Sequence, residues 1–178
     1  MDRKEFLKGC ATGLCACVAA CMPAMSANAA DGPKPEDWKL PFVKRRYAKL
    51  LAALQGRVDG AALTASLQDM GAYCSSENDA GTKKFAGNVD GFAAEIAKNG
   101  STVERKGEST YVLTYDPKGD CFCPFNSLAA KTPGVMCECS AGWARHTWGI
   151  ILGKEPKVAI AESVLRGGKV CRFEITKV

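Results

Sequence analysis

The 178-residue sequence has a single histidine, His146, and several familiar sets of catalytic residues are missing from it. It contains no paired carboxylates placed for general acid and base catalysis, and no Ser, His and Asp in the order that hydrolases use. It also contains no glycine-rich phosphate loop. These absences argue against carboxylate-pair catalysis, serine hydrolysis and nucleotide binding through such a loop.

Positive charge is present but scattered. The formal net charge is +5 over the whole chain, and Lys44-Arg45-Arg46 is the one basic cluster. No nucleic-acid-binding motif stands beside this cluster, so we interpret it as the solvated face of a helix. The sequence therefore predicts no nucleic-acid partner. It also has no internal repeat or low-complexity tract.

The N-terminal apolar stretch, Gly9–Met22, is too short to count as a membrane span. It follows a short basic region and precedes small residues that include the A-x-A pattern Ala27–Ala29, which is typical of a cleavable export signal. The order around Arg3-Lys4 resembles a twin-arginine signal with Lys in place of the second Arg. We therefore expect residues 1–29 to be a twin-arginine-like signal peptide and the protein to be exported, to the periplasm or another extracytoplasmic compartment.

A second processing site competes with cleavage after Ala29. The segment Val18–Cys21 resembles a lipoprotein box, and lipidation of Cys21 would anchor the protein to a membrane. We expect a membrane partner only in that case. Four of the ten cysteines lie in the predicted signal and would be removed with it, which leaves six in the mature chain.

After a proline-containing linker over residues 30–40, residues 41–178 are long enough for one domain with its own core. Three helical patterns come first: one that ends near Gly56, one capped by Asp59, and one that is capped by Asn88 and stops at Asn99-Gly100. On the second, Leu63, Leu67, Met70 and Cys74 share a face, so we expect Cys74 at its inner edge.

The second half changes to a period of two residues. Thr102–Lys106 and Ser109–Tyr115 are predicted to form one hairpin, and Lys157–Leu165 and Lys169–Lys177 another. Between them we expect a helix capped by Ser140 and stopped by Gly153. Cys171 alternates with Phe173 and Ile175, which predicts that it lies in the core. The predicted fold is α+β, an antiparallel sheet with helices packed on one face in a single cysteine-rich domain.

Two Cys-x-Cys units, Cys121-Phe-Cys123 and Cys137-Glu-Cys139, stand close together in the sequence. Cys137 and Cys139 precede the predicted helix, where the positive end of its dipole stabilises a thiolate. Four thiolates suit Zn²⁺, Cu(I) or an iron–sulfur cluster, with Cys74 as a replacement or fifth ligand. Disulfides and free reactive thiols stay open as alternatives, because six cysteines allow complete pairing in an oxidising compartment.

Other candidates lie along the same predicted helix. His146 is two turns from Cys139, so it is a candidate metal ligand or the general base for a Cys139 nucleophile. Trp143 and Trp148 are candidates for the lining of a ligand pocket, although aromatic residues over a sheet are core by default. Arg145 is a candidate for binding a carboxylate with two hydrogen bonds.

The C-terminal runs Cys137–Trp143, Gly153–Ile160 and Glu162–Ile175 resemble the end of the 4-vinyl reductase-type small-molecule-binding domains and of the related L-2-amino-thiazoline-4-carboxylic acid hydrolase family. Met70–Cys74 and Gly119–Pro124 extend the resemblance over most of residues 60–176. It implies a ligand sensor, a reductase accessory or a hydrolase. The doubled Cys-x-Cys and the export signal are not expected of the plain hydrolase.

Our leading hypothesis is an exported accessory or sensing domain that binds a metal or cluster through its Cys-x-Cys pairs, together with a small organic ligand or a protein partner. The first alternative is a cysteine-dependent hydrolase of a small cyclic amide or amidine, with Cys137 or Cys139 as nucleophile and His146 as base. The second is a structural domain held together by disulfides.

Overall fold

The computed structural model describes residues 38–116, 121, 123, 124 and 132–178. The predicted signal peptide, its cleavage and lipidation sites and most of the linker lie outside the described residues. Glu36–Val178 form one compact unit. No helix in the described part of the chain is both long and apolar enough to span a bilayer.

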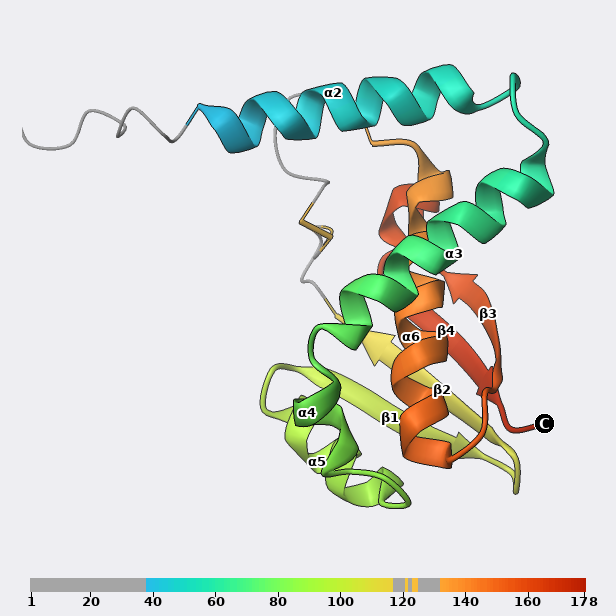
Figure 1. Ribbon diagram of the computed structural model, residues 1–178. Helices are drawn as coiled ribbons and strands as arrows, with labels where there is room; N and C mark the ends of the chain where they lie inside the picture. Colours follow the sequence, from blue (N-terminus) through green and yellow to red (C-terminus); the bar gives the residue numbers. More distant parts are fainter. Residues whose placement is uncertain (1–37, 117–120, 122, 125–131) are drawn as a thin grey trace, which may run out of the picture. The chain divides into compact units, whose positions relative to one another are not determined.

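Helices α2 (Lys39–Leu54) and α3 (Gly60–Ser76) occupy the first part of the domain (Figure 1). Helix α2 begins inside the predicted linker, and its Pro41 lies in the first turn, where a proline does not break the backbone hydrogen-bond pattern. The predicted cap of α3 is confirmed, because the Asp59 side chain accepts a hydrogen bond from the Ala62 backbone at 2.9 Å.

Two shorter helices follow, α4 (Asp79–Lys83), which the sequence did not predict, and α5 (Val89–Ala97). The predicted cap of α5 is also confirmed, since the Asn88 side chain accepts a hydrogen bond from the Gly91 backbone at 2.8 Å. Gly100 follows α5 with a positive φ of 78°. Glycine adopts this conformation without steric cost.

The four strands are β1 (Ser101–Lys106), β2 (Thr110–Tyr115), β3 (Lys157–Glu162) and β4 (Cys171–Thr176). All neighbouring pairs are antiparallel and the order is β1-β2-β4-β3. Both predicted hairpins are confirmed. The strand predicted over Lys157–Leu165 is shorter, because the 3₁₀ turn η2 (Val164–Arg166) replaces its end.

Helix α6 (Cys137–Leu152) crosses one face of the sheet and ends at Gly153, as predicted. Its predicted start at Ser140 is wrong. The 3₁₀ turn η1 (Gly134–Met136) runs directly into the helix, so the first helical turn begins at Cys137. The two cysteines of the second Cys-x-Cys therefore lie inside the first turn of α6 and not before it.

Helix α6, α5 and the sheet enclose the main core. Trp148 is fully buried and packs edge to face on Phe92. Its indole N–H has no hydrogen-bond partner among the described residues, so packing alone holds the ring. The predicted inward-facing positions of β4 are confirmed, since Cys171, Phe173 and Ile175 are all buried. The predicted α+β fold, an antiparallel sheet with helices packed on one face, is the fold observed.

Helices α3 and α6 cross at two glycines. A Cβ atom on Gly71 would collide with the backbone oxygen of Cys139, and one on Gly142 would collide with that of Gln68. The backbones therefore approach more closely than any other residue type allows. Beside the crossing, the hydroxyls of Ser75 and Thr147 share a buried hydrogen bond of 2.7 Å.

Candidate functional site

The crossing of α3 and α6 decides where two of the predicted site cysteines point. Residues Leu63, Leu67, Gly71 and Ser75 form the buried face of α3, whereas Cys74 is exposed. The prediction that Cys74 lies at the inner edge is wrong. The buried face of α3 repeats every four residues and passes through Gly71, where α3 contacts α6, so Cys74 falls outside it. Cys74 still lies near enough to Cys139 to affect its titration.

Cys137 and Cys139 do not carry the stabilised thiolates that their position predicted. Burial raises the pKa of Cys139 to about 11, with a further contribution from Cys74. Burial also raises the pKa of Cys137, whose buried thiol hydrogen-bonds the Ser163 hydroxyl at 3.2 Å. Desolvation penalises the charged form, and it is the largest cause of the raised pKa of both thiols.

The first Cys-x-Cys has a partner that the sequence did not predict. The Cys121 thiol hydrogen-bonds both Cys123 and Cys171. The bond with Cys123 is the first cause of the raised pKa of Cys121, and the bond with Cys121 is the first cause of the strongly raised pKa of Cys171. A residue predicted as plain core thus belongs to a cluster of thiols, which we call the thiol cluster: Cys121, Cys123 and Cys171.

The four predicted metal ligands do not converge in one place. Cys139 and Cys123 pack beside the small apolar cluster under α2, whereas Cys137 is directed to Ser163. Over the described residues, no group of three or more His, Cys, Asp or Glu side chains is arranged to hold a metal ion. Cys74, Cys137, Cys139 and Cys171 are thiols and not disulfides.

The structure does not bring His146 to Cys139. Seven residues of α-helix separate two side chains by about 10 Å along the axis, which is too far for direct proton transfer. The His146 ring is instead hydrogen-bonded to Asp79 on α4 at 2.8 Å. That bond is the first cause of the lowered pKa of Asp79. His146 therefore ties α4 to α6.

Arg145 likewise has partners other than a ligand. Its guanidinium lies 3.4 Å from Glu155 and 3.7 Å from Asp69, and it donates a hydrogen bond to the Gln68 side chain at 3.3 Å. These contacts place it on the surface between α3 and α6, and it does not line the pocket that Trp143 lines.

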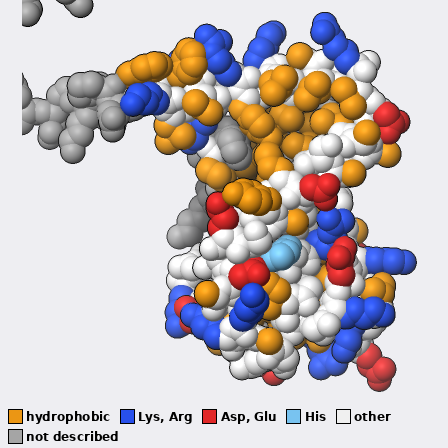
Figure 2. All heavy atoms as spheres, in the orientation of Figure 1, with side chains coloured by type: hydrophobic (Ala, Val, Ile, Leu, Met, Phe, Trp, Pro, Cys, Tyr) orange, Lys and Arg blue, Asp and Glu red, His pale blue; other side chains and the backbone are white. Residues whose placement is uncertain are grey.

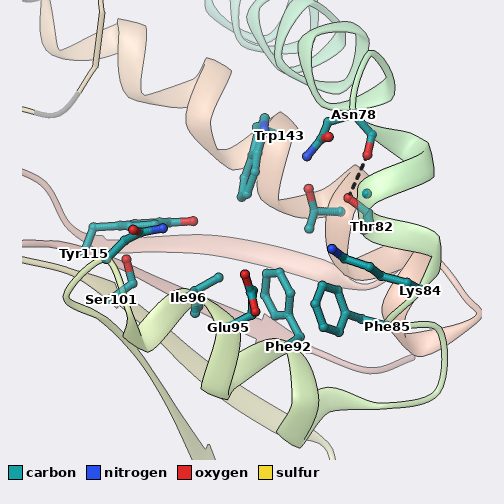
Figure 3. Close-up of a pocket in the computed structure, with 13 residues that line it drawn as sticks. Asn78, Thr82, Lys84, Phe85, Phe92, Glu95, Ile96, Ser101, Tyr115 and Trp143 are labelled. Atoms are coloured by element: carbon teal, nitrogen blue, oxygen red, sulfur yellow. Dashed lines mark hydrogen bonds between the residues drawn. The ribbon is translucent and has the colours of Figure 1, made fainter.

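A pocket with a volume of about 500 Å³ is bounded by α4, α5, the start of β1, the end of β2 and α6. This volume is in the range of small-molecule sites. Trp143 lines it, as the sequence suggested, and Phe85, Phe92 and Tyr115 supply the other rings (Figure 3). Four aromatic side chains from distant parts of the sequence therefore line one space, which is partly open to solvent.

Polar groups reach the same space from two sides. In Figure 3 the Lys84 ammonium and the Tyr115 hydroxyl both point into it. The Lys84 ammonium also lies 5.2 Å from the centre of the Phe85 ring, and among the described residues it forms no ion pair. Glu95 also lines the pocket, but its carboxylate is bound by Lys98 at 2.7 Å. The bond with Lys98 is the largest cause of the lowered pKa of Glu95, and the charge of Lys84 is the smallest cause. The charge of the Lys84 ammonium is therefore less compensated than that of the Glu95 carboxylate.

Tyr115 connects the pocket with the thiol cluster. It is paired with Cys171 across β2 and β4, and it lines the pocket at the end of β2. Burial raises the pKa of Tyr115 well above its usual value, and Cys171 raises it further. The two features therefore share one end of the sheet.

Sequence reasoning missed Lys84, Phe85 and Tyr115. Lys84 and Phe85 follow α4, a helix of 5 residues that is too short to show a hydrophobic period. Tyr115 is the last residue of a strand for which the sequence predicted only a place in a hairpin. The one available signal was that a tyrosine ends an otherwise apolar face, where its hydroxyl reaches a polar space.

No protein-family model matches the chain, and no curated protein does. The solved structures similar to it include the trafficking protein particle complex subunit 3 from Naegleria fowleri, covalently bound to palmitic acid. That chain is 15% identical, the similarity covers 76% of this chain and 95% of that one, and the TM-score is 0.49. At this level the palmitic acid of that structure says nothing about what this chain binds.

Proposed function

We propose that the domain is an exported accessory or sensing module that binds a small organic ligand in the pocket of about 500 Å³. The observation that carries the proposal is that Phe85, Phe92, Tyr115 and Trp143 line this one space. Stacked or edge-on rings favour a planar, aromatic ligand. The export of the module stays a prediction from residues 1–29.

The charge of the pocket supports an anionic ligand. Glu95 is compensated by Lys98, whereas Lys84 has no ion-pair partner among the described residues and points into the space. A ligand carboxylate would supply that partner. We therefore propose an aromatic carboxylate as the ligand class.

Two matched probes test the proposal, indole-3-acetate and its neutral amide, with binding measured by calorimetry. We expect the acid to bind at least tenfold more tightly than the amide, and Lys84→Gln to remove this difference. The control is Lys83→Gln, because Lys83 pairs with Asp79 at 3.2 Å and does not line the pocket. Equal binding of both probes would refute the proposal that the pocket prefers a carboxylate. If neither probe bound, the proposal of an aromatic ligand would be refuted.

A second function, coordination of a soft metal ion by the thiol cluster, is favoured by one observation. The Cys121 thiol already contacts both Cys123 and Cys171, although Cys171 comes from a distant part of the sequence. Sulfur atoms around a zinc ion lie about 3.8 Å apart, given a Zn–S bond of about 2.3 Å. These thiols are not arranged around a metal ion as they stand, so we propose that Zn²⁺ or Cu(I) binds to them after their side chains rearrange.

The test is anaerobic titration of the reduced protein with Zn²⁺ against a chromophoric chelator. We expect one ion per chain, loss of binding in Cys121→Ser, and normal binding in Cys74→Ser, since Cys74 is exposed and outside the cluster. Retention of zinc by Cys121→Ser would refute the site. If the cysteines instead serve as disulfides, the intact protein purified without reductant will be lighter by two hydrogens for each bond.

The hydrolase alternative gains no support from the geometry. Cys139 has a pKa of about 11, and the candidate base His146 is bonded to Asp79 instead. A nucleophilic thiol needs a lowered pKa or an adjacent base.

A further inference from the structure

Helix α2 combines exposed basic side chains with a complete lack of acidic ones. Between Trp38 and Gln55 the sequence has several lysines and arginines and no aspartate or glutamate. Arg45, Arg46 and Lys49 are exposed. Residues spaced by three or four positions share a side of a helix, so these three charges form one basic stripe.

An exposed apolar stripe runs beside the basic one. Leu40, Val43 and Leu50 are 60%, 55% and 53% exposed, and their spacing places them along one side of α2. Trp38, at the start of the helix, is 59% exposed. Figure 2 shows hydrophobic side chains gathered over α2 and α3, with Lys and Arg side chains along the outer edge of α2.

Among the described residues, the buried contacts of α2 lie on one side of the helix. Ala48 and Leu51 are its buried residues, and the Tyr47 hydroxyl donates a hydrogen bond to the Met70 sulfur at 3.1 Å. All three lie in the C-terminal half of the helix. The N-terminal half therefore presents Leu40 and Val43 to the surroundings while the other half anchors the helix.

We propose that α2 binds an anionic phospholipid surface, with its apolar stripe in the headgroup region and its basic stripe on the lipid phosphates. Charge complementarity favours this occupant, because a second copy of α2 would bring like charges together. A dry protein interface would have to desolvate Arg45, Arg46 and Lys49, whereas at a membrane surface long basic side chains keep their charged ends in the polar layer. An exposed tryptophan beside such residues is typical of membrane-interface helices.

The test is flotation of the full chain with vesicles of phosphatidylcholine alone or mixed with phosphatidylglycerol. Binding only to the mixed vesicles, lost at high salt, is the expected result. Because each basic residue near an anionic surface adds a severalfold factor in affinity, we expect the triple variant Arg45→Gln, Arg46→Gln, Lys49→Gln to bind about a hundredfold more weakly.

The matched control replaces three exposed lysines elsewhere, Lys154, Lys157 and Lys169, by Gln and so removes the same charge. It should retain binding, and any contribution of residues 1–37 is common to both variants. Equal loss in the two triple variants, or no binding to anionic vesicles, would overturn the proposal.

A spectroscopic check uses Trp38→Phe, since Trp38 is exposed whereas Trp148 is buried. A fluorescence blue shift on anionic vesicles should appear in the unmodified chain and disappear in this variant. Persistence of the shift in Trp38→Phe would also overturn the proposal.

Discussion

The two apolar clusters of the domain differ in size and in what they leave exposed. The cluster between α6 and the sheet contains Trp148 and Phe173 among many buried residues, and it is covered on the helix side. The cluster under α2 is smaller, and its buried members are Leu51, Leu63, Leu67 and Met136. Apolar burial scales with area, so the first cluster supplies most of the stability. The second holds α2 in place and leaves its outer stripes available.

The cysteines are likewise divided between the two apolar clusters. Cys171 belongs to the large cluster and Cys123 and Cys139 lie against the small one. The pKa of Cys171 is raised first by its hydrogen bond with Cys121 and that of Cys139 first by burial, so both thiols are protonated at neutral pH. A metal ion would have to displace those protons, so metal affinity should rise with pH.

The largest effect should come from the core of the large cluster. Trp148→Ala removes a fully buried ring, and the free energy of unfolding should fall by about 4 kcal/mol. Leu51→Ala removes a smaller side chain from the small cluster, and the free energy of unfolding should fall by about 2 kcal/mol. Urea denaturation measures both values. If Leu51→Ala cost as much as Trp148→Ala, the ranking of the two clusters would be wrong.

The crossing of α3 and α6 should be nearly as sensitive. Gly142→Ala places a methyl group against the Gln68 backbone, which cannot move without separating the helices. This overpacking should cost about 3 kcal/mol. Gly149→Ala is the matched control on the same helix, because its nearest atom is the Glu155 Cα at 3.7 Å. The control should be neutral or stabilising, since alanine favours a helix over glycine. Thermal unfolding of the two variants distinguishes these outcomes.

Thiol reactivity should separate the exposed cysteine from the buried ones. The pKa of Cys139 is about 11 and Cys74 is exposed. At pH 7 only about one Cys139 in ten thousand is then a thiolate, so iodoacetamide should label Cys74 at least about tenfold faster. Peptide mass spectrometry over time gives both rates, and Cys74→Ser should abolish the fast phase. Rapid labelling of Cys139 at pH 7 would revive the nucleophile hypothesis.

The smallest effect concerns the contact between α4 and α6. The pKa of Asp79 is lowered below its ordinary value of 3.8, first by the hydrogen bond with His146. The contribution of this carboxylate to stability is therefore present above about pH 4 and is lost as the pH falls. Asp79→Asn should lower the melting temperature slightly at pH 7 and by less at pH 3, where part of the carboxylate is protonated. A difference of equal size at both pH values would show that the charge of Asp79 is not involved.

Local signals in the sequence determined most of the secondary structure. Asp59 and Asn88 cap helices because their side chains accept from backbone N–H groups three residues on, and this requires no distant partner. The alternation of Cys171, Phe173 and Ile175 likewise specified the inner face of β4. The antiparallel sheet with helices on one face followed from these patterns.

The tertiary structure alone decided what the candidate site contains. Helix α6 begins at Cys137, and not at the predicted Ser140, because η1 leads directly into it. In this position the Cys137 thiol bonds to Ser163. Three features of the site join residues that are distant in the sequence. Cys121 contacts Cys171, Lys84 and Tyr115 line the same pocket, and His146 pairs with Asp79. Spacing along the chain encodes which face a residue occupies. The neighbours on that face depend instead on how closely whole elements pack, and here Gly71 and Gly142 set that approach.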